Sequence, residues 1–208
     1  MAELSEAELF QHYDHIIGVD EAGRGCLAGP VYVCAVSCPH SRYHELLNME
    51  RLTDSKKLSP KQREQVLSEL QSMGISYRVS VVNHRVIDEI NILQAARLGM
   101  KRSVARLHMP KKASVLVAVD GNQPIETIYP QLTVIKGDVK FKTIAAASIF
   151  AKVLRDRFMV AVSRKWPCYG FEKHKGYPAA AHKKAIEEHG PCPIHRLTFR
   201  GVLPKECE

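Results

Sequence analysis

Short apolar runs, bounded by glycine, proline or charged residues, recur along the first two thirds of the chain. Runs of this length and composition predict buried strands, here over about residues 15–19, 30–37, 114–119 and 132–135. The run at 114–119 is apolar throughout, which is typical of a strand in the middle of a sheet that is covered on both faces. Residues 75–81 alternate apolar and polar side chains and predict a half-buried strand.

Between these runs, apolar positions recur at three- and four-residue steps, the spacing of amphipathic helices. The clearest helix start has Ser59 as N-cap, Pro60 at the first helical position and Gln62 completing a capping box. The predicted helices cover residues 60–73, 84–107, 138–165 and 178–189, the second of them as one helix or as two joined at Gly99.

The order of these elements predicts the fold class. Strands come first as a cluster and then alternate with helices, which predicts an α/β fold with one mixed central sheet, helices on both faces and a helical C-terminal segment. The chain has 208 residues without an internal repeat or linker, so we expect a single domain over residues 1–208. The acidic first dozen residues are expected to be frayed or lightly helical. No apolar stripe is left over once the core is assigned, which favours a monomer.

Composition argues against a membrane or secreted protein. The chain is 45% hydrophobic and 25% charged, as is ordinary for a globular protein, and no apolar run approaches the roughly 18–20 residues that span a bilayer. The first residues are acidic where a signal peptide needs a basic region and an apolar core, so we expect a cytoplasmic protein with no membrane partner. The six cysteines are then expected to be reduced thiols. Cys34, Cys38 and His40 lack the second ligand pair of a structural zinc site.

The formal net charge of +8 is unevenly distributed. Residues 1–135 hold 15 Lys/Arg and 15 Asp/Glu, whereas residues 136–208 hold 15 Lys/Arg and 7 Asp/Glu. A basic C-terminal third suggests a polyanionic partner. A solvated basic surface that keeps the protein in solution explains the charge equally well.

Four carboxylates stand at the ends of predicted strands or at a predicted helix start. Asp20 and Glu21 follow the first strand, Asp120 follows the run at 114–119, and Asp138 opens a helix. Ligands of open α/β sheets bind beyond the carboxyl ends of the strands, so parallel neighbouring strands would bring Asp20 and Asp120 together. Taken singly, each residue is explained by a helix cap, a turn or a solvated corner. Together, with the basic third of the chain, they predict a two-metal site of the kind that hydrolyses phosphodiesters.

A glycine turn, Gly23-Arg24-Gly25, follows the first carboxylate pair directly. As a dinucleotide-binding turn it fits poorly, because its spacing departs from G-x-G-x-x-G and a strand-like run follows where a helix belongs. The carboxylates would also repel a pyrophosphate. The better interpretation is a turn that lets the backbone approach a sugar closely, with Arg24 available for a phosphate.

An ordered set of motifs runs from residue 18 to about residue 199. The set consists of Gly18–Gly25, Asp54–Leu58, Val119–Gly121, Lys136–Asp138, Ala145–Ile149 with Ala151–Asp156, and His174–Tyr177. These segments resemble the type 2 ribonucleases H, and most closely the bacterial ribonucleases HII. The first motif together with the Lys-Gly-Asp and His-Lys-Gly-Tyr segments is highly specific.

The resemblance implies an RNase H-like fold and a metal-dependent endoribonuclease. Such an enzyme hydrolyses the RNA strand of RNA–DNA hybrids and incises duplex DNA on the 5′ side of a single embedded ribonucleotide, leaving a 5′-phosphate and a 3′-hydroxyl. Mg²⁺ or Mn²⁺ is the implied cofactor. The implied partners are RNA–DNA hybrids and ribonucleotide-containing duplex DNA.

The resemblance also implies roles for particular residues. Reading of the RNA–DNA junction falls to Tyr177, which on its own would be taken for a core tyrosine. Lys56 is either a phosphate contact or a solvated loop lysine, and Asp156 is either part of the active-site surroundings or a helix salt-bridge partner. The catalytic and metal-binding carboxylates are Asp20, Glu21, Asp120 and Asp138, and the residues that recognise the 2′-hydroxyl through their backbone are Gly23, Arg24 and Gly25.

Two functions of other classes compete with the nuclease. A catalytically silent hybrid-binding module on the same fold would need a broken carboxylate set, whereas all four carboxylates are present. A nucleotide-dependent enzyme that uses the glycine turn would have to bind free nucleotide.

Overall fold

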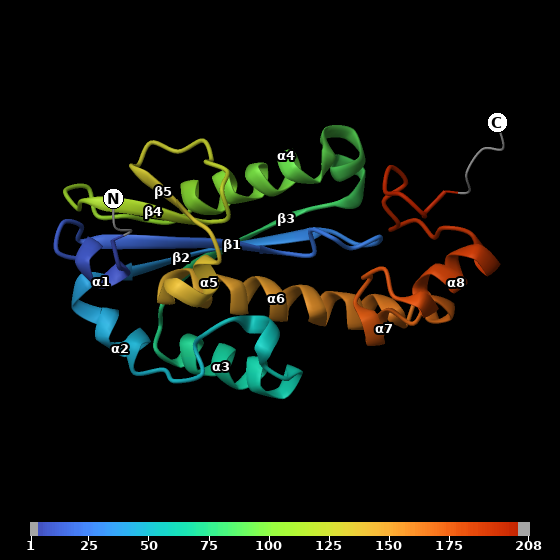
Figure 1. Cartoon of the computed structure of the whole chain (residues 1–208), viewed down its shortest axis with the longest axis horizontal. Helices are drawn as coiled ribbons and strands as arrows, with labels where there is room; N and C mark the ends of the chain where they lie inside the picture. The colour runs from blue at the N-terminus through green and yellow to red at the C-terminus, as the bar shows by residue number, and fades with distance from the viewer. Residues whose placement is uncertain (1–3, 204–208) are drawn as a thin grey trace.

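The computed structural model describes residues 4–203, and a mixed sheet of five strands lies at the centre of this range (Figure 1). The strands are β1 (His15–Ala22), β2 (Val31–Pro39), β3 (Ser76–Val82), β4 (Val115–Asp120) and β5 (Gln131–Val134). They are ordered β3-β2-β1-β4-β5 across the sheet. β1 pairs antiparallel with β2 and parallel with β4; β2 pairs antiparallel with β3, and β4 pairs parallel with β5.

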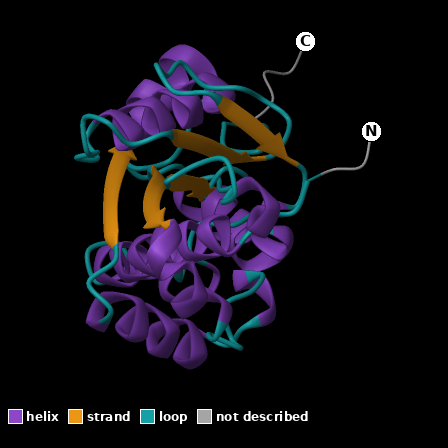
Figure 2. Ribbon diagram, turned by 90° about the vertical axis from the view of Figure 1, so that its left-hand side faces the viewer, coloured by secondary structure: helices purple, strands orange, loops and turns teal. Residues whose placement is uncertain are grey.

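Helices cover both faces of the sheet, as predicted (Figures 1 and 2). The helices are α1 (Glu6–Leu9), α2 (Tyr43–Leu47), α3 (Pro60–Ser72), α4 (His84–Ala105), α5 (Gly137–Lys140), α6 (Lys142–Ser163), α7 (Phe171–His174) and α8 (Ala180–His189). α4 packs on one face against β2 and β3, and α6 packs on the other face against β1 and β2. α3 lies behind α6, and α7 and α8 form the expected helical C-terminal segment.

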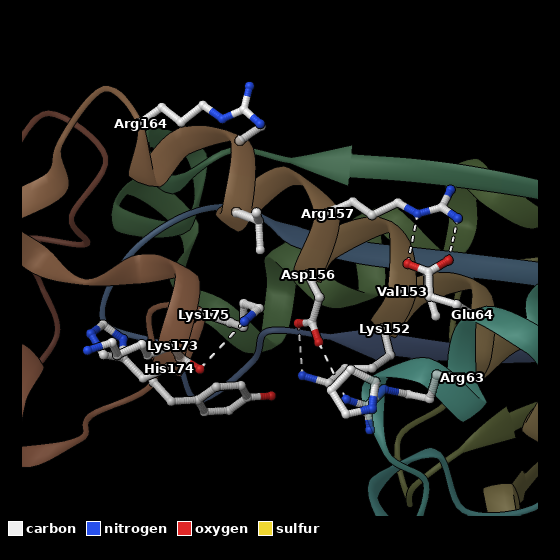
Figure 3. A pocket seen from close by; sticks show the side chains of 14 residues that line it. Arg63, Glu64, Lys152, Val153, Asp156, Arg157, Arg164, Lys173, His174 and Lys175 are labelled. Atoms are coloured by element: carbon white, nitrogen blue, oxygen red, sulfur yellow. Dashed lines mark hydrogen bonds and ion pairs between the residues drawn. The ribbon is translucent and has the colours of Figure 1, made fainter.

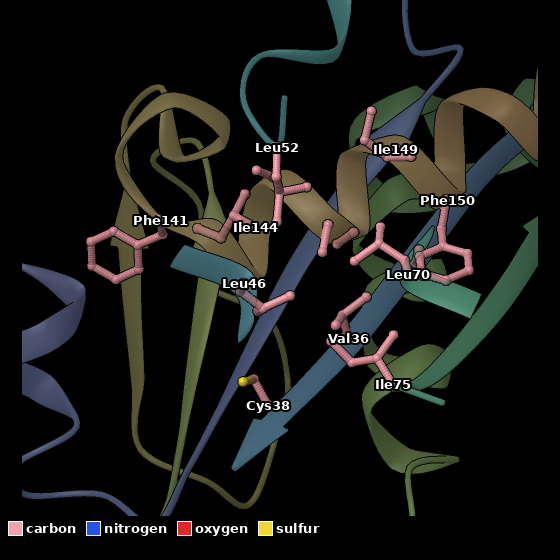
Figure 4. Close-up of a cluster of buried hydrophobic side chains, with 14 of the residues drawn as sticks. Val36, Cys38, Leu46, Leu52, Leu70, Ile75, Phe141, Ile144, Ile149 and Phe150 are labelled. Carbon is pink, nitrogen blue, oxygen red and sulfur yellow. The ribbon is translucent and has the colours of Figure 1, made fainter. Parts of the chain in front are cut away.

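Successive residues of β1 enter two separate cores, because side chains alternate across a strand. Ile17 and Val19 pack on the side of α4, whereas Ile16 joins the core under α6. Figure 4 shows part of this second core, to which Val36 of β2 and Phe150 of α6 also belong. Gly18 also faces α6, and a Cβ built there would lie 2.2 Å from the carbonyl carbon of Thr143. The start of α6 therefore rests directly on β1, and only glycine leaves room for this contact.

The N-terminus of α6 is capped by a residue that is distant in the sequence. Its own N-cap residue, Phe141, offers no side-chain acceptor. The Glu6 carboxylate instead accepts the backbone N–H groups of Lys142 and Thr143 at 2.6 and 3.1 Å, and the Thr143 hydroxyl at 2.5 Å. The N-terminal segment thus forms the short helix α1, in line with the lightly helical alternative, and it fixes the helix that crosses Gly18.

Two predicted helices differ in detail from the structure. The helix over 84–107 breaks at Asn91, whose φ is 64°, and not at Gly99. The Asn91 side chain accepts the N–H of Gln94 at 3.1 Å, so Asn91 starts the second part of α4 as an N-cap. The helix predicted from Asp138 is interrupted at Phe141, where the backbone is extended, and divides into α5 and α6.

The other elements follow the prediction closely. The five strands lie within a few residues of their predicted bounds, and the capping box at Ser59 and Gln62 is present in both directions, at 3.3 and 2.8 Å. The five cysteines of residues 4–203 are free thiols, and Cys207 lies outside the described residues. In the same range no helix is long and apolar enough to cross a membrane.

Candidate active site

The carboxylates predicted to meet at the sheet edge do so through the parallel pairing of β1 with β4. Val19 lies opposite Val119 in the register of this pair, so the next residues, Asp20 and Asp120, stand side by side where the two strands end. Asp20 belongs to the face that α6 covers, and its carboxyl group accepts a hydrogen bond from Ser148 of that helix. Both strands thus deliver a carboxylate to one edge.

Asp138 reaches this edge from the next segment. The chain leaves β5 and turns at Lys136, a residue with φ 57°. Gly137 then donates its backbone N–H to the Oδ1 atom of Asp120 at 2.7 Å. A Cβ at Gly137 would meet this same oxygen at 3.1 Å and the Ile144 side chain at 2.6 Å, so glycine allows the approach. The Lys-Gly-Asp motif is therefore a device that holds Asp138 against Asp120.

Burial and like charge act together on these carboxylates. Asp20 and Asp138 are 6% and 7% exposed. Burial raises the pKa of Asp20 well above its usual range, and the neighbouring charges of Glu21 and Asp120 raise it further. Burial likewise raises the pKa values of Glu21 and Asp138, and Asp120 adds to both. Buried carboxylates that repel one another are unfavourable unless a positive charge compensates them, and a bound cation supplies that charge.

Two of the four carboxylates are turned toward basic side chains. Glu21 lies 3.6 Å from a guanidinium nitrogen of Arg24, and Asp138 lies 3.9 Å from the ammonium nitrogen of Lys56. Within residues 4–203 no three acidic, histidine or cysteine side chains converge closely enough to hold a metal ion as they stand. The donor set still fits a hard divalent cation, because it consists of carboxylate oxygens alone. Both ion pairs are long, so a bound cation can replace the basic side chain in each of them.

The glycine turn behind the carboxylates combines a constrained position with an open one. Gly23 has φ 95°, and a Cβ there would lie 1.9 Å from the Nε atom of Arg155. Gly25 has no atom within 4 Å of such a Cβ and is exposed. The fold therefore explains the first glycine, whereas the second leaves a stretch of backbone bare toward solvent. β2 follows this turn, so the dinucleotide interpretation, which needs a helix there, is wrong.

Two fully buried arginines support the backbone around the glycine turn, and Arg196 bonds to the turn itself. Arg155 of α6 donates to the backbone carbonyls of Pro30, Lys175 and Ala28 at 3.0, 2.9 and 3.1 Å. Arg196 donates to those of Gly29, Arg24 and Gly23 at 2.9, 2.9 and 2.7 Å. Both side chains are 0% exposed, and burial lowers the pKa of Arg196 to about 10. Carbonyl dipoles thus satisfy these buried charges.

Tyr177 stands next to the glycine turn, on a loop that Arg155 holds through its hydrogen bond to the Lys175 carbonyl. Tyr177 is 38% exposed, and its ring lies 5.9 Å from the Arg155 guanidinium and 5.2 Å from the Lys152 ammonium group. Behind the loop, the backbone carbonyl of Tyr177 lies 2.8 Å from Nδ1 of the buried His182. Burial raises the pKa of the Tyr177 hydroxyl to about 12, so this phenol is neutral at ordinary pH.

A cavity of about 230 Å³ joins these parts. It brings together nearly all the residues predicted for the site. Asp138 does not line it, and its ion pair with Lys56 connects it to the lining. Asp156 stands apart from it and pairs with Lys152 at 2.9 Å and Arg63 at 3.8 Å, in agreement with the salt-bridge alternative. The predicted residues that line the cavity are Asp20, Glu21, Gly23, Arg24, Gly25, Lys56, Asp120 and Tyr177.

Sequence reasoning missed several residues of the site. Ser148 and Lys152 line the cavity, and Arg155 and Arg196 support its glycine turn. Ser148, Lys152 and Arg155 lie in motif segments in which the sequence suggested a role for Asp156 alone. Arg196 lies outside every segment, and no pattern in the sequence distinguishes it from the other basic residues of the C-terminal third.

Known proteins match this chain over nearly its whole length. The family model for Ribonuclease HII matches residues 17–202. Ribonuclease HII of Chlorobium chlorochromatii is 45% identical over 94% of this chain and 94% of its own length. That of Porphyromonas gingivalis is 47% identical over 89% of each chain.

Solved structures share the fold. Ribonuclease H2 from Pyrococcus horikoshii is similar with a TM-score of 0.77 and 28% identity, over 90% of this chain and 95% of that one. A Bst-RNase HIII structure in complex with Mn²⁺, 17% identical with a TM-score of 0.72 over 97% of this chain and 73% of that one, matches in fold alone.

Proposed function

The chain belongs to the ribonuclease HII family, and from this premise we propose that its cavity hydrolyses the RNA strand of RNA–DNA hybrids and incises duplex DNA on the 5′ side of a single ribonucleotide. The protein is a ribonuclease H, a hydrolase of phosphodiesters. The observation that supports the substrate assignment is one cavity in which paired carboxylates, a bare glycine turn and an exposed tyrosine face each other. The products would be a 5′-phosphate and a 3′-hydroxyl.

The chemistry depends on a divalent metal, as in the family. We propose Mg²⁺ or Mn²⁺, in a two-metal site held by Asp20, Glu21, Asp120 and Asp138. When bound, such cations supply an activated water and stabilise the leaving oxygen. The carboxylates contribute the negative charge that holds them, and Gly137 keeps Asp120 oriented through its backbone N–H.

Recognition of the ribonucleotide falls to the glycine turn. A 2′-hydroxyl is the group by which a protein distinguishes RNA from DNA. Gly25 is exposed, and no atom lies within 4 Å of where its Cβ would stand, so a sugar can approach the backbone closely from that side. Arg155 and Arg196 engage carbonyls of the turn and its surroundings from behind, which keeps it rigid. Arg24, which is exposed, is available for a phosphate.

Tyr177 and Lys56 complete the proposed substrate contacts. The exposed ring of Tyr177 would pack against the first deoxynucleotide after the ribonucleotide, and in this way read the junction. The Lys56 side chain, 82% exposed above Asp138, would contact a phosphate. Both proposed contacts rest on the observation that Tyr177 and Lys56 line the same cavity as the carboxylates.

The partners follow from this activity. We propose RNA–DNA hybrids and ribonucleotide-containing duplex DNA as the bound nucleic acids, a monomer as the working unit, and a cytoplasmic location.

The test is cleavage of end-labelled duplexes with Mg²⁺, with Mn²⁺ and with a chelator. An RNA–DNA hybrid should be cut in its RNA strand with either metal and remain intact with chelator, while all-DNA and all-RNA duplexes remain intact in every reaction. Tight binding of the hybrid without cleavage would replace the nuclease by the silent binding module. Metal-independent cleavage would remove the metal site.

A further inference from the structure

A second hollow, of about 760 Å³, lies beside the active-site cavity between α3, α6 and the segment around α7 (Figure 3). Six basic and two acidic side chains line it, and we call it the basic groove. The acidic residues are Glu64 and Asp156. The basic residues are Arg63, Lys152, Arg157, Arg164, Lys173 and Lys175.

Internal ion pairs leave much of this positive charge uncompensated. Glu64 is held by Arg157, and Asp156 is shared between Arg63 and Lys152. Arg164 and Lys173 are exposed, and neither takes part in an ion pair within residues 4–203.

Lys175, which also lines the groove, has charges of both signs around it. Burial lowers the pKa of Lys175; the nearby carboxylates of Asp156 and Glu172 oppose this shift, and repulsion from Lys152 and Arg63 adds to it. An anion in the groove would relieve this repulsion.

The basic groove continues the active-site cavity in one direction. Lys152 and Tyr177 line both hollows, whereas Asp20, Glu21, Asp120 and the glycine turn line only the cavity. Tyr177 therefore stands where the basic groove meets the cavity that holds the carboxylates and the glycine turn. On the proposed function, the carboxylates act at the scissile phosphate, the glycine turn binds the ribonucleotide, and Tyr177 packs against the first deoxynucleotide along the cleaved strand. The groove then lies on the 3′ side of the ribonucleotide.

The length of the groove suits a run of phosphates. Lys152, Asp156, Val160 and Arg164 succeed one another at four-residue steps and share one face of α6. A helix rises about 1.5 Å per residue, so this face is about 18 Å long. One strand of B-DNA advances about 3.4 Å per nucleotide, so the face matches about five nucleotides.

We propose that the basic groove binds the phosphodiester backbone of the ribonucleotide-containing strand over the several deoxynucleotides that follow the junction. This inference rests on the proposed function and adds the direction and the strand to it. Arg164 and Lys173 supply the free charge at the end far from Tyr177. The expected role is binding, and it leaves the chemical step unchanged.

Two matched double variants test the groove. Arg164→Gln with Lys173→Gln removes two exposed charges from it without breaking an ion pair of the described residues. Lys111→Gln with Lys112→Gln removes the same charge from an exposed turn before β4, at the opposite end of that strand from Asp120. Each protein is assayed on a duplex with one ribonucleotide, for binding in chelator and for cleavage with Mg²⁺.

Neutral methylphosphonate linkages then locate the contact. Three duplexes are compared, one unmodified and two in which about four phosphates are neutral, either 3′ to the ribonucleotide or at the opposite positions of the complementary strand. Neutral linkages on the 3′ side should weaken wild-type binding about tenfold, and the groove variant should lose most of this sensitivity. Its Kd for the unmodified duplex should rise about tenfold, with a log–log salt slope shallower by about two and kcat unchanged.

Three results would overturn the groove assignment: equal losses in the groove variant and the control variant, undiminished sensitivity of the groove variant to the 3′ linkages, or sensitivity confined to the complementary strand. If the groove takes an acidic protein instead, the groove variant binds and cleaves every duplex as the wild type does. Failure of the proposed function is distinguishable, because the wild-type protein would then not cut the unmodified duplex at all.

Discussion

At the scale of single residues, Asp120 combines two tasks that a conservative substitution separates. Its Oδ1 atom accepts the Gly137 N–H, and its charge contributes to the proposed metal site. Asp120→Asn keeps an acceptor oxygen and removes the charge. We expect cleavage of an RNA–DNA hybrid to fall by at least about a hundredfold while hybrid binding changes little. Glu126→Gln, at a residue whose side chain is 78% exposed, is the control. Full activity of Asp120→Asn would remove the metal assignment.

Tyr177 separates the two proposed substrates. A ring that packs against a nucleotide contributes about 1–3 kcal/mol. This contact matters most where a single ribonucleotide supplies all the RNA character. Tyr177→Ala should therefore reduce kcat/KM for single-ribonucleotide incision about tenfold more than kcat/KM for a long hybrid. Tyr177→Phe should keep the ratio, because the ring is retained. Equal losses on both substrates in Tyr177→Ala would contradict junction reading.

Arg155 is a positioning residue. Its planar guanidinium reaches three carbonyls at once, and a lysine cannot reproduce this fork. We expect Arg155→Lys to lower the free energy of unfolding by about 2–4 kcal/mol. Among molecules that remain folded, preference for the single ribonucleotide should weaken, since the backbone that follows the glycine turn and the loop before Tyr177 lose their shared support. Urea unfolding and the ratio of the two kcat/KM values measure these effects.

The neighbouring Arg157 provides the control for Arg155. It makes an exposed ion pair with Glu64, so Arg157→Lys should change stability by less than about 1 kcal/mol. An Arg155→Lys protein with wild-type stability and an unchanged substrate ratio would show that the buried guanidinium has no positioning role.

At the scale of elements, α6 depends on α1 for its cap. Glu6 satisfies two N–H groups at the start of α6 and lies at its positive end. Glu6→Ala leaves both donors buried without an acceptor, and we expect it to cost about 2–3 kcal/mol of unfolding free energy. Glu8→Ala is the control, because Glu8 caps only the exposed α1. A loss at Glu6 no greater than at Glu8 would contradict this role.

A pair of buried histidines links α8 to the loop that carries Tyr177. The Tyr177 carbonyl can only accept, so Nδ1 of His182 donates to it. The Nε2 atoms of His182 and His195 lie 3.1 Å apart, and Nδ1 of His195 accepts the Cys192 N–H at 2.9 Å. The chain of bonds requires both rings to be neutral, because a further proton would set two N–H groups against each other. Burial and the neighbouring His182 lower the pKa of His195 to about 4.

This pair predicts acid sensitivity. The unfolded chain takes up the His195 proton near pH 6.5, whereas the folded protein resists it down to about pH 4. The stabilisation is therefore complete above about pH 6.5 and is lost as the pH falls to about 4, a change of at most about 3 kcal/mol. The free energy of unfolding, measured with urea, should depend less steeply on pH over this range in His195→Gln. The substitution His44→Gln, at an exposed residue, should leave this pH dependence unchanged. An unchanged slope in His195→Gln would show that another group is responsible.

The sequence predicted element types better than their interruptions. The spacing of apolar residues located the strands and the long helices, because each of them buries one face and repeats apolar side chains at the period of that face. The breaks at Asn91 and Phe141 depend on local turns that leave the apolar period almost intact. Gly99, the break that was predicted, instead sits where α4 packs closely on Val33, which is a tertiary reason for a glycine.

At the scale of the whole molecule, the carboxylate edge could be predicted and its support could not. Strand ends meet at one edge of a parallel pair, so two aspartates after two apolar strands indicate a site without any coordinates. Glu6 caps α6 across 136 residues, and Arg196 reaches Gly23 across 173. Contacts of this kind involve single residues without a period, and only the folded chain brings them together.

The central claim is that one cavity couples metal-dependent hydrolysis to recognition of a single 2′-hydroxyl. The most direct test is to map incision at nucleotide resolution on a DNA duplex with one ribonucleotide, labelled at each end in turn, with Mg²⁺. We expect one cut, on the 5′ side of the ribonucleotide, with a 5′-phosphate and a 3′-hydroxyl, and no cut when that 2′-hydroxyl is replaced by hydrogen. Cleavage on the 3′ side, or cleavage of long hybrids alone, would contradict it.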